Sequence, residues 1–358
     1  MPGPFAWSEG HEQIVYGNDP ESGLQCIIAI HSTRLGPSLG GTRFLAYEDE
    51  EEALIDVLRL STAMTYKAAC AGLDLGGGKA VIIGDPAEVR SEALLRAYGR
   101  MIETLAGRYI TACDVGTTPE DMAMVARETR WATGMDEAHG GSGDSGVPTA
   151  RGVFLAMRAA AEHRWGSPSL QGRHVAVQGL GKVGRRLVGH LLDDGAKVSA
   201  ADIDQEAVAE VASLPGVEVV DVEDVLLTDA EIVSPNALGS VLGAETIAEL
   251  RAQVVCGGAN NQLVDVEDAA RLHERGILFA PDYVVNAGGL INVAGELAPG
   301  GHSPARVERR LEQIPHTLRE IFVRARDEDI STELAAERVA ESRMAQVGGL
   351  RRLWLPRA

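Results

Sequence analysis

Two lysines lie in the least charged part of the chain, Lys67 within MTYKAA and Lys79 within LGGGKAV. Burial removes the hydration of an ammonium group, so the pKa of such a lysine can fall from about 10.4 toward 7 or 8, where the amine serves as a general base. A carboxylate, Asp114, follows the apolar run YITAC and precedes a glycine and threonine turn. Together these groups suit an amino acid, whose α-carboxylate needs a cation and whose α-amino group needs a proton acceptor. The residues alone leave a plainer interpretation open, namely exposed lysines beside a turn and a carboxylate that only caps it.

A second set of residues has the pattern of a dinucleotide-binding turn. The sequence GLGKVG at 179–184 comes directly after the strand-like HVAVQ and directly before the helical RRLVGHLLDD. Glycines at this spacing permit a tight turn, let the backbone approach a pyrophosphate and let the helix pack against the strand. Asp202 ends the next strand, where a carboxylate would bind a ribose 2′-hydroxyl and repel a 2′-phosphate, so NAD is favoured over NADP. The cofactor-binding residues predicted here are Gly179, Gly181, Lys182, Val183, Gly184 and Asp202.

The first half of the chain predicts a mixture of strands and helices that must position the lysines and Asp114. Apolar, β-branched runs predict strands, and apolar residues spaced near 3.6 predict helices. The segment LGPSLGG at 35–41 is rich in glycine and proline and is interpreted as a turn. Strands are expected at 24–31, 79–84 and about 108–113, and helices at 51–71, about 91–105 and about 119–127.

The second half alternates between strand and helix patterns, which is typical of a parallel, doubly wound sheet. Strand-like runs are HVAVQ, KVSAAD, VEVVD, EIVSPNA, VVCGGAN and ILFAPDYVV, and a long charged helical stretch covers 305–347. Between the halves, HGGSGDSGVPT at 139–149 has the composition of a linker, and 139–146 is the expected hinge.

We therefore predict an α/β protein of two domains. The first, at 1–145, is an N-terminal α/β domain for substrate binding, catalysis and oligomerisation, and a C-terminal helix at about 325–358 returns to it. The second, at 146–324, is a Rossmann-type NAD-binding domain with a doubly wound parallel sheet.

Composition restricts the class of protein further. The 358 residues carry a formal net charge of −19, which repels phosphate backbones and lipid headgroups, so neither nucleic acid nor a membrane is an expected partner. The N-terminus lacks the pattern of an export signal. Four cysteines without CxxC spacing are expected to be reduced thiols, and no metal site is expected. A cytoplasmic location is favoured, and the tail with Arg351, Arg352, Trp354 and Arg357 is expected to be solvated or to face another subunit.

Six segments resemble the glutamate/leucine/phenylalanine/valine dehydrogenase family, and within it the leucine and valine dehydrogenase branch. They occur in the family's order and are GPSLGGTR at 36–43, MTYKAACAGLDLGGGKAVI at 64–82, TACDVGTTPEDM at 111–122, GLGKVG at 179–184, CGGANNQL at 256–263 and APDYVVNAGGLINVAGEL at 280–297. The resemblance implies NAD-dependent oxidative deamination of L-amino acids to 2-oxo acids and ammonia, run reversibly by a homo-oligomer.

The resemblance also implies roles for individual residues. Lys67 would bind the substrate carboxylate, helped by backbone N–H groups around Gly40 and Gly41. Lys79 would act as the general base on water, and Asp114 would exchange a proton with the substrate nitrogen. By the same resemblance Asn260 would contact the nicotinamide ribose, and Asn286 would lie near the substrate amino group and the nicotinamide carboxamide. Asparagine beside glycine is also common in turns, which is the plainer interpretation of both.

Substrate preference follows from the pocket wall that the resemblance implies, formed by Leu39, Ala112, Leu290 and Val293. Glutamate dehydrogenases carry a lysine where Leu39 stands, so an acidic substrate side chain would lose its counterion here. Leu290 narrows the pocket and favours valine, leucine or isoleucine over phenylalanine. A phenylalanine or other aromatic amino-acid dehydrogenase and a catalytically silent NAD-binding protein remain the alternatives. Gly295 stands where relatives usually place an acidic residue, and the sequence gives no consequence for this difference.

Overall fold

The computed structural model describes residues 10–349, which form two compact units. The first unit contains 10–144, 293–303 and 340–349, and the second contains 145–292 and 304–339. Each unit is described by itself below. The arginine and tryptophan tail at 351–357 lies outside the described residues.

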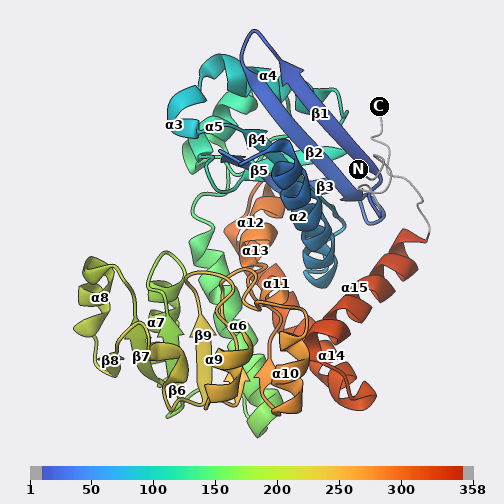
Figure 1. Cartoon of the computed structure of the whole chain (residues 1–358). Helices are drawn as coiled ribbons and strands as arrows, with labels where there is room; N and C mark the ends of the chain where they lie inside the picture. The colour runs from blue at the N-terminus through green and yellow to red at the C-terminus, as the bar shows by residue number, and fades with distance from the viewer. Residues whose placement is uncertain (1–9, 350–358) are drawn as a thin grey trace. The chain divides into compact units, whose positions relative to one another are not determined.

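A five-stranded mixed sheet forms the centre of the first unit (Figure 1). Its strand order is β1-β2-β4-β3-β5; β1 and β4 run antiparallel to β2, while β3 runs parallel to both β4 and β5. The strands are β1 (Gln13–Asp19), β2 (Leu24–Ser32), β3 (Ser38–Leu45), β4 (Gly76–Ile83) and β5 (Tyr109–Cys113).

Strand β3 corrects part of the interpretation of LGPSLGG as a turn: residues 35–37 form a bend, but 38–41 belong to the strand. Ser38 to Thr42 pair with Tyr109 to Cys113, so the two glycines of this segment lie inside a central strand. Their small size permits close packing, because a Cβ added to Gly40 would lie 1.7 Å from the carbonyl oxygen of Gly78. Glycine inside a strand often marks a site where another backbone approaches closely. The edge strand β1 was also not predicted.

Helices cover both faces of this sheet. The long helix α2 (Glu50–Cys70) begins at Asp49, whose side chain accepts a hydrogen bond from the backbone N–H of Glu52. It buries Ala53, Val57 and Leu58 against β2 and β4. Helices α4 (Glu92–Glu103) and α5 (Pro119–Val125) pack on the opposite face, and the short α3 (Pro86–Val89) follows β4. The two faces of the sheet therefore meet different helices.

The second unit is built on a six-stranded parallel sheet with the order β11-β10-β9-β6-β7-β8. Numbered from the first strand of the unit and read from β8, this order is 3-2-1-4-5-6, which is that of a Rossmann dinucleotide-binding fold. The switch in strand order lies between β6 and β9. The strands are β6 (His174–Gln178), β7 (Lys197–Ala201), β8 (Val217–Val219), β9 (Ile232–Pro235), β10 (Val254–Val255) and β11 (Leu278–Phe279). The predicted α/β class and doubly wound parallel sheet are confirmed.

The helices and 3₁₀ turns between residues 137 and 297 are mostly short. They are α6 (Gly146–Trp165), α7 (Gly184–Asp193), α8 (Gln205–Ala212), α9 (Ala244–Glu249), α10 (Asp268–Glu274), α11 (Asp282–Val285) and α12 (Gly288–Ala294), with 3₁₀ turns η1 (Glu137–His139), η2 (Val225–Leu227) and η3 (Gly295–Leu297). Residues 282–285 were expected to continue a strand, but Pro281 ends the extended segment and α11 begins immediately after it.

The predicted helical stretch 305–347 is divided into α13 (Pro304–Leu311), α14 (Gln313–Glu328) and α15 (Thr332–Gly348). Asp329 adopts a left-handed backbone with φ of 51° and ends α14. The hydroxyl of Ser331 then accepts a hydrogen bond from the backbone N–H of Leu334 and begins α15. A serine followed by helix-forming residues was therefore the local signal for the break.

Three further observations concern the described residues. No helix among them is long and apolar enough to cross a membrane. Cys26, Cys70, Cys113 and Cys256 are free thiols. Across positions 10–349, no group of three or more His, Cys, Asp or Glu side chains has the arrangement to hold a metal ion.

Candidate active site

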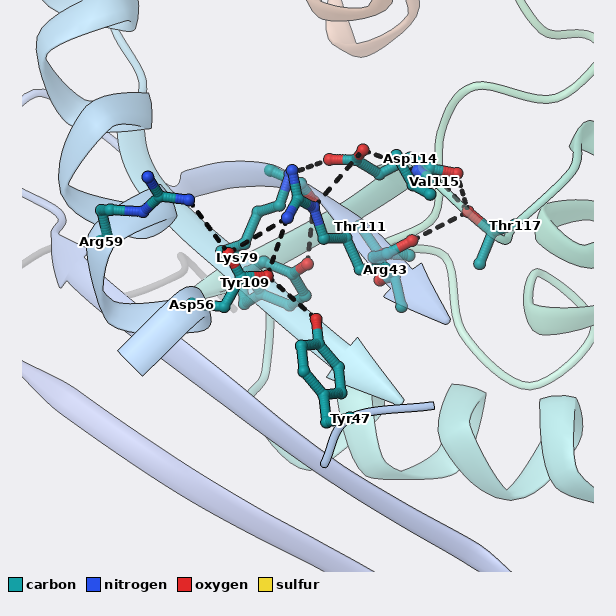
Figure 2. Close-up of polar contacts among 12 residues, drawn as sticks. Arg43, Tyr47, Asp56, Arg59, Lys79, Tyr109, Thr111, Asp114, Val115 and Thr117 are labelled. Carbon is teal, nitrogen blue, oxygen red and sulfur yellow. Dashed lines mark hydrogen bonds and ion pairs between the residues drawn. The ribbon is translucent and has the colours of Figure 1, made fainter. Parts of the chain in front are cut away.

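Lys79 is a buried lysine in the middle of the sheet of the first unit. It lies on β4 with 5% of its surface exposed, and β2 and β3 flank that strand. Its Nζ donates a hydrogen bond to Oδ2 of Asp114 (Figure 2). A lysine this deeply buried in a folded protein is rare unless it is paired, and here the partner is a carboxylate.

The pKa of Lys79 is lowered by its surroundings. Burial is the largest cause and brings the pKa from 10.5 to about 7. The positive charges of Arg43 and Lys67 also lower this pKa, while the carboxylate of Asp56 raises it. A large fraction of Lys79 is therefore neutral near pH 7, as a general base requires.

Asp114 is held at the carboxyl end of β5 by backbone hydrogen bonds. Its Oδ1 accepts a hydrogen bond of 2.6 Å from the N–H of Val115, and its own N–H donates to the hydroxyl of Thr117 over 2.9 Å. Gly41 on β3 leaves room for this side chain, because an added Cβ would lie 3.2 Å from Oδ2 of Asp114 and 2.7 Å from the carbonyl oxygen of Cys113. The carboxylate therefore has one position beside Lys79.

Two predicted substrate residues of the sheet, Leu39 and Ala112, lie on the same face as Lys79. Leu39 pairs with Gly77, and Gly41 pairs with Ala112. Because paired residues share a face and side chains alternate along a strand, Leu39, Lys79 and Ala112 point to the α2 side. Leu39 and Ala112 are buried. The structure therefore brings Leu39 and Ala112, the two predicted wall residues that lie on this sheet, to the lysine's face.

Lys67 approaches this face from α2. It lies in the last turn of that helix, and its ammonium is close enough to lower the pKa of Lys79. The close contact of α2 with β4 depends on Gly77, where an added Cβ would lie 2.1 Å from the backbone nitrogen of Thr65. The glycine run before Lys79 is thus what permits a helix to pass this close to the strand.

Two charged residues of this cluster were not predicted from the sequence. Arg43 on β3 donates from Nη1 to both carboxylate oxygens of Asp56 on α2, at 3.1 and 2.9 Å. Tyr47 donates its hydroxyl proton to Oδ2 of Asp56 over 2.9 Å (Figure 2). Arg43 stands inside the segment GPSLGGTR, so its position was available, but its pairing with a helix residue depends on the sheet register.

The glycine turn of the second unit lies at the switch point of the Rossmann sheet. Gly179 has a left-handed backbone with φ of 91° and follows β6 directly. A Cβ added to Gly184 would lie 1.8 Å from the carbonyl oxygen of Gly179, whereas one added to Gly181 would meet nothing within 4 Å. The first and third glycines are therefore required by the fold, and the second leaves the backbone open to a ligand.

The start of α7 fits a pyrophosphate. Val183 precedes the helix and makes no side-chain capping hydrogen bond, and Lys182 beside it is exposed. Backbone N–H groups at a helix N-terminus attract anions. The carboxylate of Asp202, directly after β7, accepts hydrogen bonds from the N–H groups of Leu180 and Asp204, so it connects the strand end to the glycine turn.

The two predicted asparagines are in contact with each other. Asn286 is 5% exposed, and its Nδ2 donates to Oδ1 of Asn260 over 2.8 Å and to the carbonyl oxygen of Gly258 over 3.3 Å. Leu290 is buried in the same unit, on α12. Val293, near the end of α12, belongs to the first unit and is half-buried.

Gly295 stands where relatives usually place an acidic residue, and the residue after it, Glu296, has a structural role. The carboxylate of Glu296 accepts hydrogen bonds from the backbone N–H of Gly134, at 3.1 Å, and of Ser142, at 2.9 Å. All three residues belong to the first unit. Glu296 therefore fastens the segment in which the hinge was predicted.

Comparisons with known proteins agree with this arrangement. A family model described as the dimerisation domain of Glu/Leu/Phe/Val dehydrogenase matches residues 11–131, and one described as Glutamate/Leucine/Phenylalanine/Valine dehydrogenase matches 140–208 and 202–350. The chain is 54% identical over 339 residues to valine dehydrogenase of Streptomyces virginiae, with 94% of each chain covered. It is 48% identical to leucine dehydrogenase of Geobacillus stearothermophilus, over 93% of this chain and 90% of that one.

A solved structure has a similar fold. The crystal structure of L-tryptophan dehydrogenase from Nostoc punctiforme gives a TM-score of 0.86 at 42% identity and covers 96% of this chain and 99% of its own. The family resemblance predicted from six short segments is thus confirmed over most of the sequence. The chain belongs to the Glu/Leu/Phe/Val dehydrogenase family.

Proposed function

We propose that this protein catalyses NAD-dependent oxidative deamination of small branched aliphatic L-amino acids, namely valine, leucine and isoleucine. In this reaction an amino acid, NAD⁺ and water give a 2-oxo acid, ammonia, NADH and a proton, and the reaction is reversible. The observation that carries the proposal is the buried Lys79 paired with Asp114 in a member of this dehydrogenase family. A catalytically silent NAD-binding protein would have no need of a buried lysine and carboxylate pair, since such burial is costly.

The residues of the first unit bind the substrate and move its protons. Lys67 binds the α-carboxylate, with backbone groups near Gly40 and Gly41. Neutral Lys79 takes a proton from the water that attacks the substrate Cα after oxidation. Asp114, in contact with Lys79, exchanges a proton with the substrate nitrogen. The same pair returns these protons in the aminating direction.

The residues of the second unit hold the cofactor. Members of the family are dehydrogenases, so a nicotinamide cofactor is expected, and when bound it supplies the hydride acceptor. The glycine turn at 179–184 receives the pyrophosphate at the start of α7, where Gly181 leaves the backbone open. Asp202 binds the adenosine ribose and disfavours a 2′-phosphate, which selects NAD over NADP. Asn260 contacts the nicotinamide ribose, and Asn286 lies near the amino group and the carboxamide.

Substrate preference is assigned to apolar side chains. Leu39 and Ala112 lie on the α2 face of the sheet, and the proposal adds Leu290 and Val293 as further apolar residues that contact the substrate. A glutamate side chain would place its carboxylate against Leu39 without a counterion, at a cost of several kcal/mol if it is desolvated. Two named relatives, a valine dehydrogenase and a leucine dehydrogenase, agree with aliphatic substrates. The similar tryptophan dehydrogenase structure keeps an aromatic substrate as the second candidate.

The functional unit is proposed to be a homo-oligomer in the cytoplasm. The family model over residues 11–131 is described as a dimerisation domain, which supports assembly through the first unit. Amino acids and 2-oxo acids are its small-molecule partners.

Initial rates with a panel of L-amino acids test this function. NADH formation at alkaline pH is measured with valine, leucine, isoleucine, phenylalanine, tryptophan and glutamate. We expect kcat/KM to be highest for an aliphatic branched substrate and at least about 100-fold lower for glutamate, which corresponds to roughly 3 kcal/mol. Highest kcat/KM for an aromatic amino acid would assign the protein to the second candidate, and no NADH with any amino acid, despite NAD binding, would refute enzymatic activity.

A further inference from the structure

Arg43 lies between two carboxylates at the catalytic pair. On one side its Nη1 donates to both oxygens of Asp56, and on the other its Nε lies 3.9 Å from Oδ1 of Asp114 (Figure 2). The side chain of Arg43 is 22% exposed and that of Asp56 is 12% exposed. The guanidinium of Arg43 is restricted in direction, because its Nη1 donates to both oxygens of one carboxylate.

The orientation of Arg43 leaves one donor unused toward the catalytic carboxylate. Its Nε is buried and has no hydrogen-bond partner among residues 10–349. This nitrogen forms an ion pair with Oδ1 of Asp114. The two atoms are 3.9 Å apart, which is slightly beyond hydrogen-bond distance. A small movement of Asp114 would therefore complete a charge-assisted hydrogen bond and limit how far this carboxylate can move from Lys79.

Asp56 is itself held by two partly buried neighbours. It accepts hydrogen bonds from Arg43 and Tyr47, whereas Arg59, whose side chain is 63% exposed, lies 3.4 Å from its Oδ1 at the surface. Burial and the neighbouring Asp56 raise the pKa of Tyr47, so this phenol keeps its proton and stays a donor. Asp56 and Tyr47 thus determine the direction of the Arg43 guanidinium.

We propose that Arg43 is a positioning residue for the deamination: held by Asp56, its guanidinium keeps the Asp114 carboxylate against the Lys79 amine and supplies positive charge beside both. This inference rests on the proposed function and extends its site to Arg43 and Asp56, which were not predicted from the sequence. Arg43 acts through Asp114 and Lys79 and has no chemical step of its own.

The charged groups that face Lys79 allow a test in which two substitutions move the pKa of Lys79 in opposite directions. They are Asp114 after β5, Arg43 on β3, and Lys67 and Asp56 on α2. Arg43 and Lys67 favour the neutral amine, whereas Asp56 favours the charged form. Removing Arg43 should therefore move the pKa of Lys79 upward, and removing Asp56 should move it downward.

The experiment compares Arg43→Gln, Arg43→Lys and Asp56→Asn with the wild-type full chain. The rate of the first turnover with L-valine and NAD is measured against pH by stopped flow, and the thermal unfolding midpoint is recorded for each variant. Arg59→Gln is the matched control, because Arg59 also contacts Asp56 but its side chain is 63% exposed.

The expected results differ between variants. Arg43→Gln lowers the rate of the first turnover at least about 10-fold. It also moves the acidic limb of the pH profile toward higher pH by about half a pH unit or more. Asp56→Asn moves the acidic limb toward lower pH. Arg43→Lys keeps the acidic limb of the pH profile, because the charge remains. It lowers the rate, because lysine has one nitrogen and cannot face Asp56 and Asp114 with separate donors as Arg43 does. Arg59→Gln leaves both unchanged.

Two results would overturn the inference. One is a folded Arg43 variant whose first-turnover rate is within about twofold of wild type and whose pH profile has its acidic limb at the wild-type position. The other is a limb that moves in the same direction in Arg43→Gln and Asp56→Asn, which would indicate general loosening. If Arg43→Gln does not fold, Arg43→Lys and Asp56→Asn decide the question. Absence of turnover in the wild-type protein would instead contradict the proposed function.

Discussion

At the scale of single residues, the chemistry depends on one lysine that the fold keeps largely neutral. Burial lowers the pKa of Lys79 to about 7, so its amine is protonated below that pH and cannot accept a proton from water. The rate of the chemical step in deamination should therefore fall about tenfold for each pH unit below 7 and level off above it. The pH dependence of the first turnover measures this, with saturating substrate so that the amino group of free valine does not contribute. A limb near pH 10 in its place would exclude Lys79 as the base.

The residues that the sequence could predict here are those whose chemistry is visible in their own neighbourhood. Lys67, Lys79 and Asp114 stand in apolar or turn segments that differ from the rest of the chain. Arg43 and Asp56 look like ordinary surface charges in the sequence, because their pairing requires β3 to lie beside β5 with α2 across it. Their role could not be predicted without the register.

At the scale of elements, glycines decide how closely α2 approaches the catalytic strand. Gly77→Ala would place a Cβ 2.1 Å from the backbone nitrogen of Thr65, so α2 and its Lys67 must move away from Lys79. We expect a loss of about 1–3 kcal/mol in the free energy of unfolding together with at least about a 10-fold loss of kcat/KM. Denaturant unfolding and steady-state rates measure the two effects.

Gly189→Ala is the control for that substitution. Gly189 lies in α7, and a Cβ added there would meet nothing within 4 Å, so alanine should be neutral or stabilising by up to about 1 kcal/mol. Equal stability of the two variants would show that the packing of α2 on β4 is looser than described.

The end of β7 determines the choice between cofactors. Asp202→Ser removes the carboxylate that would repel a 2′-phosphate, so the ratio of kcat/KM with NADP to that with NAD should rise at least about 10-fold. Asp204→Ser, which changes the neighbouring carboxylate that caps α8, serves as the control and should leave the ratio unchanged. Rates with both cofactors measure this, and a ratio unaffected by Asp202→Ser would remove Asp202 from the ribose site.

Most elements could be predicted from periodicity, and the exceptions have physical causes. The strands around 24–31 and 108–113 and the helix around 51–71 appear close to where they were expected. Strand β3 was missed because its glycines, next to Pro37, are typical of turns, although here the glycines allow backbones to approach. The helical stretch expected over 305–347 is divided into three helices, and Asp329 and Ser331 separate the last two of them.

At the scale of the whole molecule, the two units divide the proposed work between substrate and cofactor. The first is matched by a family model described as a dimerisation domain, so the purified chain should be a homo-oligomer. Light scattering after size-exclusion chromatography should give a mass that is a whole multiple of the chain mass and greater than one chain. A single-chain mass over the full range of concentrations used in the assay, with activity retained, would contradict assembly.

The central claim is that amino-acid oxidation and release of ammonia are one reaction that depends on Lys79. The most direct test incubates the purified protein with L-valine and NAD and quantifies NADH, ammonia and 2-oxo acid in the same sample. The account predicts the three products in equal amounts for the wild type and a loss of at least about 100-fold in Lys79→Ala, with NAD binding retained. NADH formed without ammonia, or equal turnover by Lys79→Ala, would contradict it.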